Sequence, residues 1–368
     1  MQIRRLQVSN VRNLSRVSIP LQTINIFYGA NGSGKTSLLE AAHLLLMGRS
    51  FRQTQLRPLL ADGADQCTVF GELASPGSGR VTLGLSRQRD GSKPAIKLNG
   101  QPLALISELV QVAPVQVLGA DSFEILTGGP ANRRRFLDWG LFHVEPEFYQ
   151  AWRLAQRALK QRNTLMRHGK IDRNQLLLWT REYARYGEQV DRMRQAYIEQ
   201  LLPLARTATE ALLPGLEERL ESSYARGWPR EMDLATALEQ SLDADLQHGH
   251  TRLGPHRADL RVRAGQHLAA DICSRGQLKM LVAVLHLAQA ELLQVRAQKR
   301  SIFLVDDLAA ELDDVSRRRL CGELERLGVQ VLATSIKAED LGDCWSESQQ
   351  LQMFHVEHGI ISPASATV

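Results

Sequence analysis

The sequence predicts a mixed α/β protein with an α/β core built from both ends of the chain, an antiparallel β layer and a mainly helical insertion. Three observations indicate this fold. An apolar strand, a glycine-rich loop and a helix follow one another between residues 23 and 47. Strand and helix patterns alternate again over residues 301–334. Between them, glycine nearly disappears from residues 147–204 and apolar residues recur every three or four positions. We expect a first lobe of residues 1–118 and 279–368, and a second of residues 119–278.

The first elements of the core are a strand and a helix. Residues 23–28 form a β-branched and aromatic run that stops at Gly29, as a buried strand does. Residues 37–47 are rich in leucine and alanine, which predicts a helix. Residues 68–99 change to short alternating segments between Pro, Gly and Ser turns, so we expect an antiparallel sheet layered on the core.

The insertion contains two amphipathic helical patterns. The first has apolar residues at Phe148, Trp152, Ala155 and Leu159, and the second extends from Trp179 to Leu201. The polar segment 168–172 separates them, which predicts an antiparallel hairpin with arms of about 30 Å for roughly 20 residues each. The pattern leaves open whether the hairpin protrudes or packs as ordinary core helices.

The last third of the chain returns to α/β alternation. We expect a helix over residues 277–298, a strand over 301–305, a helix over 315–327 and a strand over 329–334. Residues 354–361 have the pattern of a closing β-hairpin.

Composition excludes several classes of protein. The hydrophobic content of 43% is that of a globular chain. The four cysteines are widely separated, which suggests neither a zinc site nor a disulfide framework and favours a reducing compartment. Apolar runs such as residues 280–288 are shorter than a membrane span, so we expect a soluble, cytoplasmic protein. The net charge of +5 permits a polyanionic partner without requiring one.

A complete G-x-x-x-x-G-K-[ST] motif lies between the first strand and the first helix. Backbone N–H groups of such a loop enclose phosphate oxygens at a helix N-terminus, where the dipole favours negative charge. Lys35 then reaches the β- and γ-phosphates of ATP, and the Thr36 hydroxyl binds Mg²⁺. The predicted nucleotide-binding residues are Gly29, Ala30, Asn31, Gly32, Ser33, Gly34, Lys35, Thr36 and Ser37.

A P-loop also needs a carboxylate at the end of a neighbouring strand. The apolar segment 302–305 ends in Asp306 and Asp307. We expect Asp306 to hold Mg²⁺, and Asp307 to orient or deprotonate the attacking water, with Lys35 as the other catalytic residue. Without the loop upstream, the two acids would more simply be a solvated turn or helix cap. Gln116 is a further candidate for sensing Mg²⁺, although a strand glutamine is the simpler interpretation.

Histidines also raise the possibility of a metal site. His248, His250 and His256 lie near a turn, and His355 and His358 lie in the expected terminal hairpin. We interpret all five as surface or packed side chains rather than as metal ligands.

A second set of motifs resembles the ABC class of ATPases. Ser274, Arg275, Gly276 and Gln277 resemble the signature loop, which in that class reaches the γ-phosphate held by a second subunit. Glu311, Leu312 and Asp313 resemble the D-loop. Many ABC proteins carry a switch histidine where this chain has Thr334 and Ser335, so the γ-phosphate sensor is left open.

Further segments resemble the RecF family of DNA-repair ATPases, whose heads are similar to those of SMC proteins. They are residues 6–13, 48–52, 128–138 and 253–260. The resemblance implies an ABC-ATPase-like head that binds ATP and Mg²⁺, dimerises on ATP, hydrolyses it slowly with stimulation by DNA, and binds single-strand gaps or ss/dsDNA junctions. It also implies that the protein acts with RecO and RecR to load RecA, supports replication restart and the SOS response, and is nucleoid-associated without a membrane partner.

DNA binding requires cations that follow phosphates. The candidates are arginines of the helical hairpin together with Arg133, Arg134, Arg135, Arg49 and Arg52. Arg257 is open to three interpretations, as a DNA contact, as part of the ATP site or at the contact between lobes.

Two alternatives share the nucleotide motifs. One is the nucleotide-binding subunit of a membrane transporter, against which the RecF-like segments and the helical insertion argue. The other is a clamp that uses ATP only to hold two subunits together, against which the presence of both Asp306 and Asp307 argues.

Overall fold

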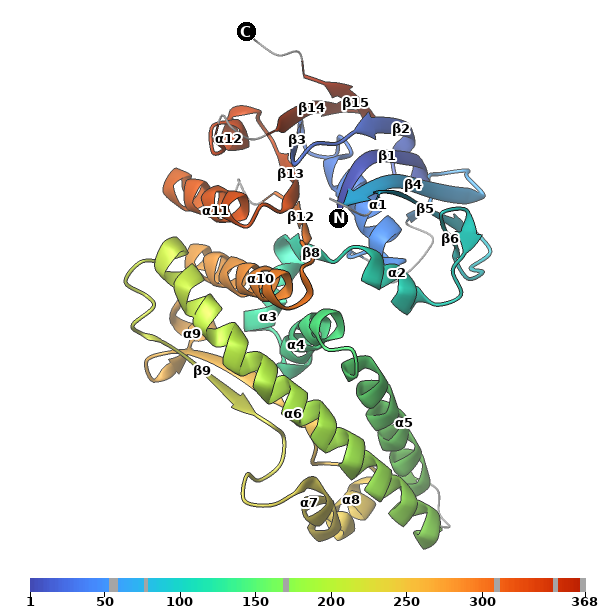
Figure 1. Cartoon of the computed structure of the whole chain (residues 1–368), viewed down its shortest axis with the longest axis vertical. Helices are drawn as coiled ribbons and strands as arrows, with labels where there is room; N and C mark the ends of the chain where they lie inside the picture. The colour runs from blue at the N-terminus through green and yellow to red at the C-terminus, as the bar shows by residue number, and fades with distance from the viewer. Residues whose placement is uncertain (53–58, 76–78, 168–171, 308–311, 347–349, 365–368) are drawn as a thin grey trace. The chain divides into compact units, whose positions relative to one another are not determined.

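The computed structural model of the chain describes residues 1–52, 59–75, 79–167, 172–307, 312–346 and 350–364 (Figure 1). The chain forms two compact units. Unit 1 comprises Met1–Ser122 and Lys279–Val368, and unit 2 comprises Phe123–Leu278.

The centre of unit 1 is a six-stranded sheet to which both ends of the chain contribute. Its order is β15-β14-β3-β13-β12-β8, and only the edge strand β15 is antiparallel to its neighbour. The strands are β3 (Ile24–Tyr28), β8 (Val115–Leu118), β12 (Ile302–Val305), β13 (Gln330–Ser335), β14 (Leu351–Glu357) and β15 (Ile360–Pro363). All residues of β12 and β13 are buried, as expected for parallel strands that are covered on both faces.

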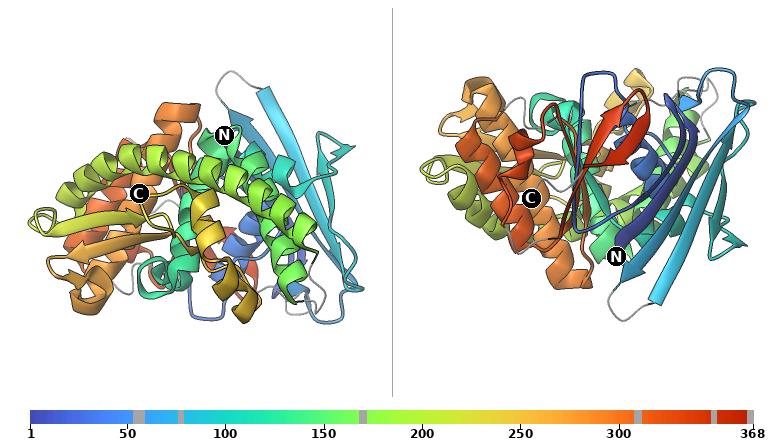
Figure 2. Two further views of the ribbon diagram at one scale, coloured as in Figure 1. Left: turned by 90° about the horizontal axis from the view of Figure 1, so that it is seen from below. Right: turned by 90° about the horizontal axis from the view of Figure 1, so that it is seen from above.

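An antiparallel sheet forms the second layer of unit 1. Its order is β2-β1-β4-β5-β6-β7, and Figure 2 shows β4 and β5 as a long antiparallel pair. The strands are β1 (Gln2–Val11), β2 (Leu14–Pro20), β4 (Gln66–Ser75), β5 (Gly79–Gln88), β6 (Ala95–Leu98) and β7 (Gln101–Pro102). The alternating pattern of residues 68–99 therefore predicted the sheet correctly, but β1 and β2 were not predicted.

Helix α1 (Lys35–Met47) lies between the two sheets. It contacts β1, β4 and β5 of the antiparallel sheet and β8 and β13 of the parallel one. Twelve of its side chains are buried, so it has no solvated face, and its leucines and alanines join both sheets into one core. This packing fixes the helix N-terminus, and with it the glycine-rich loop.

Four further helices belong wholly or mainly to unit 1. They are α2 (Ile106–Val112), α10 (Arg275–Ala297), α11 (Asp314–Arg326) and α12 (Glu339–Gly342). Among the described residues α10 is the one helix with the length and composition of a membrane span, whereas the sequence had suggested only short apolar runs. However, 78% of its apolar window is buried, which is typical of a core helix.

Unit 2 is mainly helical and also contains a small sheet that the sequence did not predict. Its helices are α3 (Glu124–Thr127), α4 (Pro130–Val144), α5 (Phe148–Arg167), α6 (Arg173–Leu212), α7 (Leu234–Gln240), α8 (Leu242–His248) and α9 (Ala269–Ile272). The strands β9 (Leu220–Ala225), β10 (Asp259–Ala264) and β11 (His267–Leu268) pair in the order β11-β10-β9.

The predicted helical hairpin is present as α5 packed against α6. The prediction that both arms have roughly 20 residues is wrong for α6, which has 40 residues. Pro203 lies inside α6, where it removes one hydrogen bond. Burial of Ala205, Ala208 and Leu212 beyond the proline outweighs that cost and carries the helix past the expected end of the arm.

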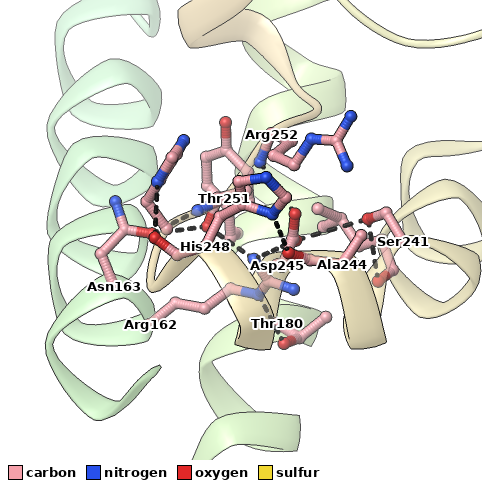
Figure 3. A network of polar contacts seen from close by, with 12 residues as sticks. Arg162, Asn163, Thr180, Ser241, Ala244, Asp245, His248, Thr251 and Arg252 are labelled. Atoms are coloured by element: carbon pink, nitrogen blue, oxygen red, sulfur yellow. Dashed lines mark hydrogen bonds and ion pairs between the residues drawn. The ribbon is translucent and has the colours of Figure 1, made fainter. Parts of the chain in front are cut away.

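A buried arginine fastens α8 to the hairpin (Figure 3). Arg162 of α5 and Asp245 of α8 form an ion pair at 2.8 Å, and both side chains are fully buried. Arg162 also donates to the hydroxyls of Thr180 and Thr251, and Asp245 accepts the backbone N–H of Arg252 at 3.0 Å. The charges are thus compensated inside unit 2, which makes this network a part of its core.

Candidate nucleotide site

The loop between β3 and α1 has backbone conformations that require glycine. Gly29 has φ +151°, and a Cβ there would lie 2.2 Å from the carbonyl oxygen of Val356. Gly34 has φ +119°, and its Cβ position is 3.0 Å from the amide of Asn13. Neither position accepts a side chain without displacing backbone or a neighbour, so the fold requires glycine at both. A glycine-rich loop of this kind at a helix N-terminus is suited to bind phosphate through its N–H groups.

Lys35, the first residue of α1, is folded back onto this loop. Its Nζ donates to the carbonyl oxygens of Gly29 at 2.7 Å and Ala30 at 2.9 Å. Burial lowers the pKa of Lys35, and the nearby Asp307 and Asp306 carboxylates oppose that shift. The ammonium therefore stays at the loop, where it can exchange carbonyl partners for phosphate oxygens.

The loop also contains a buried serine, Ser33. The hydroxyl of Ser33 is buried and has no hydrogen-bond partner among the described residues. Buried hydroxyls are usually hydrogen-bonded, so an unsatisfied one at this position fits an anion held by the loop.

The predicted carboxylate pair lies across from the loop, at the end of β12. Thr36 and Thr334 both donate their hydroxyls to Oδ1 of Asp306, each at 2.9 Å. The Thr334 hydroxyl also accepts the backbone N–H of Asp307 at 2.8 Å. The Asp306 carboxylate and the Thr36 hydroxyl are therefore within hydrogen-bonding distance of each other. Carboxylate and hydroxyl oxygens are ligands that Mg²⁺ prefers. The residues present fit that ion, and the structure brings together Lys35, Thr36, Asp306 and Asp307 as predicted.

Asp307 differs from Asp306 in its surroundings. It is exposed and has φ +52°, a left-handed conformation that is uncommon for residues other than glycine. Although its side chain is exposed, the surrounding protein partly desolvates the carboxylate, and this, followed by repulsion from Asp306, raises the pKa of Asp307, whereas Lys35 and Lys279 lower it. A carboxylate with a raised pKa at the open side of a phosphate site is suited to accept a proton from water.

Three residues of this site were missed by sequence reasoning. Lys279 of α10 is buried near Asp307, and its only signal was its place five residues after Ser274. Asn13 accepts the Ser37 hydroxyl at 2.9 Å and donates to the carbonyl of Gly32 at 3.4 Å. Gly359 in the turn between β14 and β15 donates its N–H to the carbonyl of Ser33 at 2.8 Å. The N-terminal and C-terminal hairpins therefore both support the loop.

Gln116 does not join the carboxylate pair. It lies within β8, paired in register with Phe303, three residues before Asp306. Its Oε1 is 2.7 Å from Nδ1 of His286 on α10, and the side chain is buried. The simpler interpretation, a strand glutamine, describes it better than a role in sensing Mg²⁺.

The signature-like and D-loop-like motifs cap helices. Ser274 and Gln277 form a reciprocal capping box at the start of α10, where each side chain accepts the other residue's N–H, at 2.9 and 3.2 Å. Ser274, Arg275 and Gln277 are exposed. Asp313 caps α11 by accepting the N–H of Ser316 at 2.7 Å, and Leu312 is buried. Glu311 lies outside the described residues.

The candidate DNA-binding arginines divide into two groups. Arg133 forms an ion pair with Asp259 at 2.7 Å and donates to the carbonyls of Ile125 and Gly128, and Arg134 donates to the carbonyl of Ala258 at 2.7 Å. These two guanidiniums therefore stabilise unit 2. The exposed members are Arg135, Arg49, Arg52 and also Arg257.

The histidines have packing roles where the structure gives them partners. His256 contacts the Tyr183 hydroxyl at 2.6 Å and the carbonyl of Thr251 at 3.1 Å. The rings of His355 and Tyr28 lie 5.3 Å apart. Over the part of the chain that the structure describes, no three His, Cys, Asp or Glu side chains gather as a metal-binding group.

The parallel sheet, its P-loop and the carboxylates at the end of β12 define an ABC-type ATPase head of the SMC kind. Residues 2–362 match the family model "RecF/RecN/SMC N terminal domain". The chain belongs to the RecF family. It is 46% identical to "DNA replication and repair protein RecF" of Pseudomonas syringae pv. tomato (strain ATCC BAA-871 / DC3000), over 98% of each chain.

Solved structures agree with this assignment. "Structure of the recombination mediator protein RecF-ATPrS in RecFOR pathway" superposes with a TM-score of 0.84 at 25% identity, covering 99% of this chain and 98% of that one. "Crystal structure of the SmcHead bound to the C-winged helix domain of ScpA" shares the fold with a TM-score of 0.61 at 15% identity, covering 100% of this chain and 98% of that one. The family membership sets aside the alternative of a transporter subunit.

Proposed function

We propose that this chain is an ATP-dependent DNA-binding protein of recombinational repair. It binds ATP with Mg²⁺, dimerises on ATP, and binds single-strand gaps or ss/dsDNA junctions. The observation that carries the ATP-binding part is the convergence of Thr36 and Thr334 on Asp306, opposite the loop that holds Lys35. The membership of the RecF family supports the DNA-repair part.

Binding begins with the loop and α1. The N–H groups of the loop and the first turn of α1 point to the phosphates, and Lys35 leaves the carbonyls of Gly29 and Ala30 to contact the β- and γ-phosphates. Thr36 and Asp306 would hold Mg²⁺, and that ion would supply positive charge to the phosphate oxygens. Residues 1–118 and 279–368 thus form the nucleotide-binding lobe of the proposal, and residues 119–278 form the second lobe.

Hydrolysis needs a base beside the γ-phosphate. Asp307 follows the metal ligand directly, and its backbone is held by the hydrogen bond from its N–H to Thr334. We assign Asp307 to orienting the attacking water and accepting its proton, and Thr334 to positioning both acids. Thr334 lies at the position of the switch histidine of many ABC proteins, and we assign it the role of that histidine. The resulting activity is a weak, DNA-stimulated ATPase.

The site is completed by a second copy of the chain. Ser274, Arg275 and Gln277 are exposed around a helix N-terminus, which is suited to bind a second anion. In the dimer the segment Ser274 to Gln277 contacts the γ-phosphate of the partner. Loss of the γ-phosphate removes the charge that joins the subunits.

The biological partners follow from the family. RecR and RecO act with the DNA-bound dimer to load RecA, in support of replication restart and the SOS response in the cytoplasm. One structural relative is described as a recombination mediator protein in the RecFOR pathway, which supports this part of the proposal.

Sedimentation velocity tests the dimer. We expect the wild type to dimerise with ATP and Mg²⁺, and Lys35→Arg and Ser274→Arg to remain monomeric. Ser92→Arg introduces the same side chain as Ser274→Arg at an exposed loop position of unit 1 and should dimerise like the wild type. A wild type that stays monomeric with ATP, alone and with gapped DNA, rejects the two-subunit site and leaves only nucleotide binding.

A further inference from the structure

Helix α5 carries an exposed ridge of positive charge. Arg153, Arg157, Lys160 and Arg167 are all exposed, and we call these four side chains the α5 ridge. At 3.6 residues per turn their spacings of four, three and seven residues place them within an arc of about 80°. The buried residues of α5 lie on the opposite side, against the rest of unit 2. The ridge is thus the solvent face of a helix whose other face is fixed by packing.

The α5 ridge has no compensating negative charge nearby in sequence. Helix α5 contains no aspartate or glutamate. The flanking acids, Glu147 and Asp172, lie beyond its ends, and Asp172 is occupied in capping α6 through the N–H groups of Asn174 and Gln175. An ordinary solvated helix has acids interspersed with its cations at positions i and i+4. The ridge departs from that pattern along its whole length.

The contacts of the ridge leave its charges available. No described carboxylate forms an ion pair with any of the four side chains. Arg167 donates to the carbonyl of Gly249 at 3.3 Å, and the guanidinium carbon of Arg157 lies 5.8 Å from the centre of the Trp179 ring on α6. By contrast, Arg162 on the buried face of the same helix has its carboxylate partner. One helix thus separates paired from unpaired cations.

The dimensions of the ridge match a nucleic-acid backbone. From Arg153 to Arg167 the helix rises about 21 Å, which corresponds to about six base pairs at 3.4 Å each. Tyr149, one turn before Arg153 on the same side, is 40% exposed and offers an aromatic surface. Duplex DNA presents one phosphate per about 1.7 Å of axis, so every cation of the ridge can find one without a fixed register.

We propose that the α5 ridge binds the sugar-phosphate backbone of DNA. This inference rests on the proposed function, DNA binding, and names a surface for it. The ridge holds the backbone by charge, because lysine and arginine side chains on a solvent-exposed helix face pair with phosphates, which recur along DNA of any sequence. A protein partner would have to present a row of acids at the same spacing, and it is the alternative that the experiment separates.

The test measures binding as a function of salt. The variant Arg153→Gln, Lys160→Gln, Arg167→Gln removes three ridge charges and leaves Arg157 on Trp179. Fluorescence anisotropy with gapped duplex, duplex and single-stranded DNA between about 50 and 200 mM salt gives the slope of log K against log salt. We expect the slope to fall by about 2 to 3 for duplex and by about 2 for single strands, and the affinity to fall at least about tenfold.

A matched control removes the same charge elsewhere in unit 2. Arg206, Arg230 and Arg261 are exposed and lie outside α5, and their triple replacement by glutamine should leave the slope close to that of the wild type. ATP-driven dimerisation, measured by sedimentation, should be unchanged in both variants.

Three results would overturn the inference or its basis. A ridge variant that binds DNA with the affinity and slope of the wild type rejects the ridge and leaves the proposed function intact. A ridge variant with unchanged DNA binding that no longer binds purified RecR or RecO identifies the ridge as a protein surface. A wild type that binds none of the three DNAs rejects the proposed function itself.

Discussion

The buried ion pair of unit 2 and the carboxylate pair of unit 1 differ in how their charges are compensated. In unit 2, Arg162 and Asp245 are fully buried and neutralise one another, and Arg162 also donates to the hydroxyls of Thr180 and Thr251. In unit 1, Asp306 and Asp307 are adjacent and form no ion pair with an arginine among the described residues, and Lys35, which acts on both acids, donates its hydrogen bonds to loop carbonyls. The charges of Arg162 and Asp245 are therefore neutralised within the chain. The two acids and Lys35, by contrast, can each bind part of a ligand, the acids a metal ion and the lysine a phosphate.

From this difference we infer that Arg162 and Asp245 stabilise the fold, whereas Asp306 and Asp307 serve to bind a ligand. A buried pair that loses one member leaves an uncompensated charge, so its loss should lower the free energy of unfolding. The carboxylate pair is already under mutual repulsion, so its loss should change the chemistry more than the stability. The two units should therefore respond differently to substitution of a charged residue.

Replacing Arg162 should have the largest effect on stability. Arg162→Ala leaves Asp245 buried and unpaired, and we expect the free energy of unfolding, measured by urea denaturation, to fall by about 3 to 5 kcal/mol. The double variant Arg162→Met, Asp245→Leu should lose clearly less, because it removes both charges. Arg206→Ala, which breaks an exposed pair with Glu210, should change stability by less than about 0.5 kcal/mol. Equal losses for the buried and exposed variants would contradict the contrast.

Asp307→Asn should abolish turnover and spare the fold. The amide keeps the shape of the side chain but cannot accept a proton, so we expect hydrolysis of ATP to fall at least about 100-fold. ATP binding, ATP-driven dimerisation and the urea midpoint should remain near those of the wild type. Hydrolysis at the wild-type rate would refute the role of Asp307 as base, and it would revive the clamp in which turnover is incidental.

Acid should weaken the chain partly through His256. Burial is the largest cause of its lowered pKa, about 4 against 6.5 in the unfolded chain, while the Thr251 carbonyl opposes the shift. Between pH 6.5 and pH 4 the unfolded chain binds a proton that the folded chain does not. Stability therefore falls as the pH falls through that window.

His256→Gln removes this titration. From pH 7 to pH 5 the wild type should lose roughly 2 kcal/mol more than the variant, as measured by urea denaturation at each pH. His43 and His286, whose pKa values burial also lowers to about 4, remain in both proteins, so acid sensitivity should decrease without disappearing. The same loss in both proteins would show that His256 does not titrate in this way.

Thr334 tests how firmly the carboxylate pair is positioned. Thr334→Val removes the hydroxyl that links Asp306 to the N–H of Asp307, so we expect a loss of about 1 to 2 kcal/mol in stability together with slower hydrolysis. Thr334→Ser retains the hydroxyl and should differ from the wild type by less than about 1 kcal/mol. If valine and serine behave alike in hydrolysis, the hydroxyl has no positioning role.

Local sequence predicted the parts of the fold whose cause is local. The glycine-rich loop, the strand before Asp306 and the amphipathic α5 all follow from patterns of adjacent residues. The length of α6 does not, because packing beyond Pro203 outweighs its local preference to end. The small sheet of unit 2 was missed for a similar reason, since β9 has no buried residue to give an apolar pattern and joins β10 only through long-range pairing.

The same distinction applies to the site. Lys35, Thr36, Asp306 and Asp307 were predicted from motifs and are close together. Lys279 and the supports from Asn13 and Gly359 depend on which distant segments meet, and a single sequence does not contain that information. Thr334 was noticed only as the place of a missing histidine, whereas its hydroxyl joins the two acids.

Because the parallel sheet combines strands from both ends of the chain, the nucleotide site can form only late in synthesis. The hydrogen bond from Thr36 to Asp306 links residues 270 positions apart, and Thr334 and Gly359 follow later still. At a synthesis rate of roughly 5 to 20 residues per second, about 15 to 50 s pass between the synthesis of the glycine-rich loop and that of Asp306 and Asp307. ATP retention by chains released at different lengths can measure this delay, and we expect retention to begin only after residue 334 has emerged.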